Sequence, residues 1–70
     1  MGEVRAEITA NVWQVHVEVG QDVAEGVTIA ILESMKMEIP VESPAAGTIS
    51  EVLVSPDDQV QEGDVIAVIQ

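Results

Sequence analysis

The chain has 70 residues with no cysteine and one histidine, so disulfide bonds are excluded and a structural zinc site is not expected. Its 13 acidic residues against 2 basic ones give a formal net charge of −11, which would repel nucleic-acid phosphates and anionic lipid. We therefore expect protein partners, with no nucleic acid and no membrane.

The length fits one domain, residues 1–70. A chain of this length is near the lower limit for folding without disulfide bonds or bound metal ions. No apolar run approaches the roughly 20 residues that cross a bilayer, and the first residues lack the basic start and apolar stretch of a signal peptide. We expect a cytoplasmic protein that is a monomer when isolated.

Strand-forming residues dominate the composition, with 13 valines and 7 isoleucines, whereas Trp13 is the only aromatic residue. Five glycines and three prolines separate the apolar runs, and no stretch has a helical period. The sequence predicts an all-β domain. Its eight strands are expected at residues 2–8, 11–19, 22–24, 27–33, 38–44, 47–55, 59–61 and 64–69.

The second of these strands contains the clearest alternation. Val15, Val17 and Val19 are spaced to lie on one face, which predicts that they belong to the core. His16 and Glu18 then face solvent.

The two halves of the chain resemble each other when the sequence is shifted by 37 positions. Gly26 and Gly63 match, and both predict tight turns with positive φ. Val23 and Val60 match within polar loops and are expected to be buried. The remaining identities are Val4/Val41, Val15/Val52, Val17/Val54, Glu25/Glu62, Ile29/Ile66 and Ala30/Ala67.

Such a repeat predicts two four-stranded units related by a pseudo-twofold axis and packed face to face as a flattened β-barrel or sandwich. The chain ends should lie at one end of the molecule. The chain midpoint, near residue 36, should lie at the other end.

Lys36 is the only lysine and lies at this midpoint, between the apolar runs 27–32 and 39–41. Two strands meeting there predict a hairpin that holds the amine at its tip. Met35 and Met37 flank it, and exposed methionine is an adaptable contact surface. Pro40 and Pro44 remove backbone donors, which favours a sheet edge or a strand end for the strand that follows.

The segment Glu33-Ser34-Met35-Lys36-Met37-Glu38 resembles the biotin-attachment motif of the biotinyl and lipoyl carrier domains, usually Ala-Met-Lys-Met. The resemblance covers essentially the whole chain, including the turns at 20–26, 47–49 and 60–64. Ser34 replaces the usual alanine, and Asp57 stands where the first half has Gly20. Only about seven residues separate Val19 from Val27, so the domain is similar to carriers that lack a protruding thumb loop.

This resemblance implies a carrier rather than an enzyme. A biotin protein ligase would attach biotin to Lys36, with Glu33, Ser34, Met35 and Met37 as the surrounding motif. The biotin would then carry a carboxyl group, as carboxybiotin, between biotin carboxylase and carboxyltransferase partners.

Three alternatives remain at this point. Lipoyl domains modify a hairpin lysine too, but they typically have Asp before it and Ala after it. An unmodified interaction domain would tolerate Lys36→Arg. A catalytic lysine needs desolvation or a cationic neighbour, which a hairpin tip among acidic residues does not offer.

Overall fold

The computed structural model describes residues 2–70 and contains only strands, turns and loops in that range. Within it there is no helix that could span a membrane. The eight strands are β1 (Gly2–Arg5), β2 (Ala10–Val15), β3 (Asp22–Val23), β4 (Thr28–Ser34), β5 (Met37–Glu42), β6 (Gly47–Val52), β7 (Gln59–Val60) and β8 (Val65–Ile69). The all-β prediction is confirmed.

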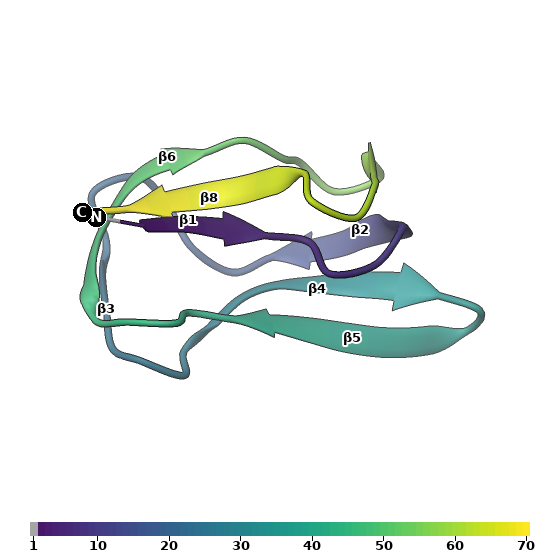
Figure 1. Ribbon diagram of the computed structural model, residues 1–70, viewed down its shortest axis with the longest axis horizontal. Coiled ribbons are helices and arrows are strands. Elements are labelled where there is room, and N and C mark those ends of the chain that lie inside the picture. Colours follow the sequence, from purple (N-terminus) through teal and green to yellow (C-terminus); the bar gives the residue numbers. More distant parts are fainter. Residues whose placement is uncertain (1) are drawn as a thin grey trace.

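The strands form two antiparallel four-stranded sheets, in the orders β1-β8-β6-β3 and β5-β4-β2-β7. The sheets lie against each other as an elongated sandwich, with both chain ends at one end and the β4–β5 hairpin at the other (Figure 1). Each sheet takes two strands from each half of the chain, so a sequence half does not form a sheet by itself. The chain passes to the other sheet after every strand except β4, which pairs directly with β5, and these crossings join the two halves in both sheets.

The internal repeat is visible in the backbone hydrogen bonds. The Val12 N–H donates to the Asp58 carbonyl at 2.7 Å, and the Ile49 N–H donates to the Gln21 carbonyl at 2.9 Å. The two donors, Val12 and Ile49, are 37 positions apart, and so are the two acceptors, Gln21 and Asp58. The bonds from Gly26 to Ser43 and from Gly63 to Ala6 are related in the same way. The shift therefore maps one sheet onto the other, as the duplication predicted.

The core lies between the sheets. Its largest fully buried side chains are Ile29, Leu32, Ile49, Ile66 and Val12, which come from β2 and β4 of one sheet and β6 and β8 of the other. Val23 and Val60 are buried as well, as their positions in the repeat predicted. Burial of these aliphatic side chains is the main stabilising contribution, at about 25 cal/mol per Å² of apolar area.

The prediction that Val19 belongs to the core is wrong, because its side chain is 65% exposed. Val17 is buried and Val15 half-buried, but β2 ends at Val15. Residues 16–21 cross to the other sheet, and their hydrogen bonds go first to Ile29 and then to Ile49. Alternation in the sequence continues into this crossover, where Val19 forms part of a turn.

Four turn residues in the two halves have positive φ. Gly26 and Gly63 have φ of 89° and 92°, which confirms the tight turns expected there. Gly20 has φ of 91°, and its counterpart Asp57 has φ of 76°. A left-handed conformation costs a residue with a β-carbon roughly 1–2 kcal/mol, and Asp tolerates it better than most. The second half therefore keeps the turn without the glycine.

We expect Asp57→Gly to stabilise the fold. Glycine adopts the left-handed conformation without strain, but it also has more conformational freedom in the unfolded chain, which offsets part of the gain. The net increase in the free energy of unfolding should be about 0.5–1 kcal/mol. Asp58→Gly is the matched control, because it also removes one negative charge. It loses the bond in which the Asp58 carboxylate accepts the Ser55 N–H at 2.8 Å, so it should lower stability. Urea unfolding of both variants tests this, and a destabilised Asp57→Gly would contradict it.

Candidate functional site

The predicted hairpin is formed by β4 and β5, which pair antiparallel from Thr28↔Glu42 to Ser34↔Met37. Leu32 and Ile39 face each other toward the core, with Leu32 fully buried and Ile39 half-buried. Beyond this pair the ladder continues past the end of the core, so the tip projects from the molecule (Figure 1). As predicted from Pro40, β5 is an edge strand, and Pro44 follows its end.

The turn itself contains only Met35 and Lys36, because Ser34 and Met37 are the last paired residues. Both turn residues have positive φ, 52° for Met35 and 65° for Lys36. Two left-handed residues in a two-residue loop are the pattern of a type I′ turn, whose twist matches that of the flanking strands. Asn and Gly are the usual residues of such a turn, so Met35 and Lys36 do not by themselves indicate this conformation. The lysine lies at the apex of a tight, strained turn.

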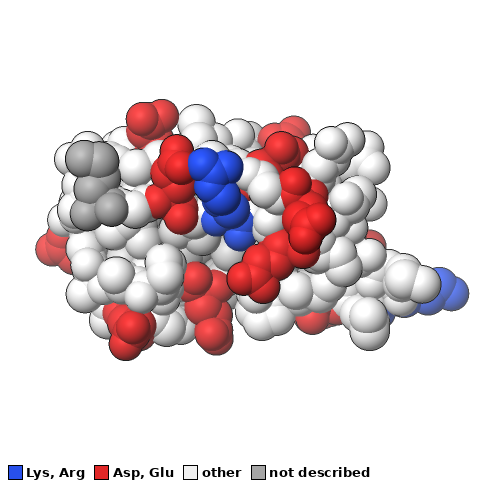
Figure 2. All heavy atoms as spheres, in the orientation of Figure 1, with Lys and Arg blue, Asp and Glu red and all other residues white. Residues whose placement is uncertain are grey.

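The structure brings together all five motif residues expected from the sequence. Met35 is 88% exposed and Met37 57% exposed, and Lys36 and Glu33 are exposed as well. Ser34 is half-buried. A basic side chain projects from the hairpin end in Figure 2, beyond the acidic side chains on the rest of that face. The amine is therefore open to a partner protein.

Carboxylates flank the tip in an arrangement that costs stability. Glu33 and Glu38 are directly opposite each other across the hairpin, and both are exposed. The one ion pair within residues 2–70 joins Arg5 to Glu3, away from this hairpin. Only the pair formed by Ser34 and Met37 separates these two like charges from the turn, and no salt bridge among the described residues offsets their repulsion.

Glu38→Gln should raise the free energy of unfolding by about 0.5 kcal/mol, because like charges directly opposite on a sheet repel. The gain should shrink at 1 M salt, where the screening length falls to about 3 Å. Glu42→Gln is the matched control in the same strand, since Glu42 is opposite the uncharged Thr28. Equal effects of the two substitutions on thermal unfolding would contradict the cross-strand explanation.

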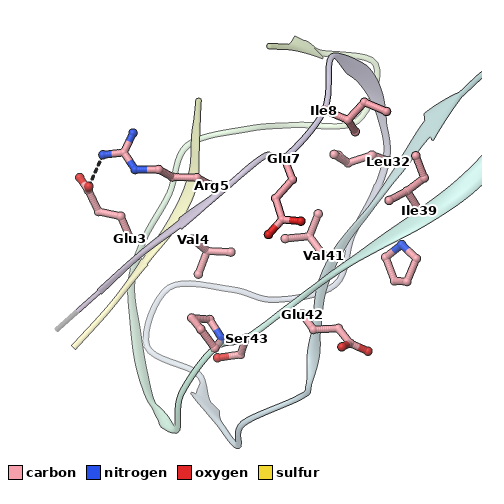
Figure 3. A pocket seen from close by; sticks show the side chains of 12 residues that line it. Glu3, Val4, Arg5, Glu7, Ile8, Leu32, Ile39, Val41, Glu42 and Ser43 are labelled. Carbon is pink, nitrogen blue, oxygen red and sulfur yellow. Dashed lines mark hydrogen bonds and ion pairs between the residues drawn. The ribbon is translucent and has the colours of Figure 1, made fainter. Parts of the chain in front are cut away.

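A cavity of about 530 Å³ lies between β1 and β5, the edge strands of the two sheets. Figure 3 shows side chains of β1 and the following segment facing those of β4 and β5 across it. Its lining includes Glu7, Ile8 and Ile39, but none of residues 33–38. The cavity adjoins the base of the hairpin and does not enclose Lys36.

The arrangement suits modification of an amine. Lys36 is exposed at an apex, where an acylating enzyme can surround it. A Schiff-base or general-base lysine instead needs a desolvated setting or a cationic neighbour. In the part of the chain that the structure describes, no group of three or more His, Cys, Asp or Glu side chains could hold a metal ion.

Comparison with known proteins agrees with this geometry. Residues 1–69 match the biotin/lipoyl family, described as biotin-requiring enzymes. The chain is 52% identical over 67 residues to a biotinylated protein TB7.3 homologue of Mycobacterium leprae, covering 96% of this chain and 94% of the relative. It is 44% identical over 63 residues to a biotin/lipoyl attachment protein of Bacillus subtilis, covering 90% of this chain and 86% of the relative.

Among solved structures, the urea carboxylase of Kluyveromyces lactis contains a region that matches 99% of this chain with a TM-score of 0.92 and 32% sequence identity. The match spans only 6% of that chain. The likeness thus concerns one small domain of a large carboxylase. With the family match over residues 1–69, it shows that this chain belongs to the biotin/lipoyl attachment family, as a domain of the biotin-requiring type.

Proposed function

We propose that Lys36 carries the biotin and that the chain serves as a biotin carboxyl carrier. The observation that carries this proposal is the position of the lone lysine. It lies exposed at the apex of a two-residue turn, between two exposed methionines. Carrier domains related to this one occur in urea and pyruvate carboxylases.

A biotin protein ligase would join the Lys36 ε-amine to the biotin carboxyl in an amide bond. The nitrogen loses a proton when the amide bond forms, so the ligase would supply a base that accepts it. When attached, biotin supplies the group to which a carboxyl unit is covalently bound for transfer. The residues of this chain position that group and leave it accessible.

The shape of the domain supports a role in delivery. The molecule measures 31 × 18 × 17 Å, and the hairpin lies at one end of its long axis (Figure 1). An enzyme can therefore admit the tip into a cleft while the rest of the sandwich stays outside. The partners that this role requires are a biotin carboxylase and a carboxyltransferase, as in the carboxylases that contain related domains.

Intact-mass spectrometry tests the proposal. The protein is incubated with a biotin protein ligase, biotin and ATP, and a single added biotinyl group is expected. Parallel incubation with a lipoate ligase and lipoate tests the lipoyl alternative, which the methionines on both sides of Lys36 disfavour. Lipoylation with no biotinylation would overturn the biotin assignment, and an unchanged mass in both reactions would favour an unmodified interaction domain. The monomeric state and the cytoplasmic location stay predictions.

A further inference from the structure

The two methionines beside Lys36 present their sulfur-bearing side chains to solvent. Met35 is 88% exposed and Met37 57% exposed, whereas Leu32 and Ile39, the large apolar side chains nearest to the tip, are buried and half-buried. The chain has no cysteine, so no thiol competes for an oxidant. The only sulfur atoms among residues 2–70 therefore belong to the two exposed residues that flank Lys36.

We propose that Met35 and Met37 are a reversible oxidation site that controls access to Lys36. The oxidant is a hydroperoxide. A sulfur lone pair attacks the outer peroxide oxygen, a sulfur–oxygen bond forms and the oxygen–oxygen bond breaks. The leaving oxygen departs as water or an alcohol after taking up the proton. Sulfur loses two electrons, the peroxide gains them, and the product is methionine sulfoxide, which methionine sulfoxide reductases reverse.

The expected consequence follows from the change in polarity. Methionine sulfoxide is polar, whereas the thioether is an apolar, adaptable contact. A ligase that encloses the tip would have to desolvate the new polar oxygens. This part of the proposal rests on the proposed function, because it requires that an enzyme contacts the tip in order to modify Lys36.

The fold should not respond to the oxidation. Met35 lies in the turn and belongs to no strand pair, and Met37 pairs with Ser34 through its backbone at the end of the ladder. Neither side chain is part of the buried cluster. A change in modification rate would therefore reflect recognition of the tip. Because the Met35 side chain is more exposed than that of Met37, we expect Met35 to be oxidised first.

The sequence provides a direct assay for that order. Arg5 and Lys36 are the only basic residues, so trypsin should divide the unbiotinylated chain into peptides 1–5, 6–36 and 37–70. Each peptide contains one methionine, and mass spectrometry of a hydrogen peroxide time course then assigns every added oxygen. Met1 lies outside the described residues, and its oxidation is measured separately in the first peptide.

The functional test compares kcat/KM for biotinylation of the reduced and the peroxide-treated protein. We expect a fall of about tenfold, the factor that corresponds to desolvating a polar group at a contact. Treatment with both methionine sulfoxide reductases should restore the rate. The thermal midpoint should not change.

The double variant Met35→Leu/Met37→Leu is the control, because leucine keeps an apolar side chain of similar size and is not oxidised by peroxide. Its biotinylation rate should be the same before and after treatment. Equal biotinylation rates for reduced and oxidised wild-type protein would overturn the proposal. A loss of rate when the leucine variant is treated with peroxide would overturn it as well. Failure of the proposed function is distinguishable, because the reduced wild-type protein would then gain no biotin at all.

Discussion

Lys36→Arg should abolish biotinylation completely. Arginine keeps the positive charge and a β-carbon, so the strain at φ of 65° and the charge at the tip are retained. The guanidinium is a poor nucleophile that stays protonated, and it does not form the amide. Intact mass after reaction with a biotin protein ligase should show no added group, while the thermal unfolding of the variant should match that of the wild-type protein.

A double exchange provides the sharper control. Arg5→Lys combined with Lys36→Arg keeps the composition and net charge identical and moves the lone lysine to β1. We expect this variant to remain unmodified, because residue 5 lies in a strand and outside the turn. Biotinylation of the double variant would mean that the ligase recognises an amine without regard to the hairpin, and residual modification of Lys36→Arg would refute Lys36 as the attachment site.

Much of the fold could be predicted because two independent signals agree. The β-branched residues indicated eight strands, and the shift of 37 positions related one set of four to the other. Pseudo-twofold symmetry then placed the chain midpoint opposite the chain ends, as Figure 1 shows. The lone lysine at that midpoint singled out the hairpin tip as the candidate site.

Other features could not be predicted, for physical reasons that differ. The exposure of Val19 depends on where β2 leaves its sheet, and alternation has the same period within a ladder and just beyond it. The pairing of strands from different halves depends on contacts that are distant in sequence. Neither Met35 nor Lys36 is a residue type that favours the left-handed region, so the strained turn is imposed by the register of Ser34 and Met37.

The core substitutions Ile29→Ala and Val17→Ala should separate stability from recognition. Ile29 is fully buried and Val17 is 5% exposed, so both truncations leave space that the sandwich does not readily refill. Ile→Ala at such a site costs about 2–5 kcal/mol. A domain of this size has only about 3–10 kcal/mol of stability in total. Ile29→Ala should therefore lower the urea midpoint strongly, and Val17→Ala should lower it to a smaller extent.

Met35→Ala and Met37→Ala are the counterparts at the tip. Because these side chains are 88% and 57% exposed, their removal changes little buried area and should leave the urea midpoint nearly unchanged. Both should slow biotinylation or the later carboxyl transfer, since the partner enzymes must contact the tip. The core variants should react at the wild-type rate once corrected for the unfolded fraction. Methionine variants that unfold like Ile29→Ala would place the pair in the interior. Variants that are both stable and fully reactive would show that the partners do not use these side chains, and Lys36 would then be recognised through the turn alone.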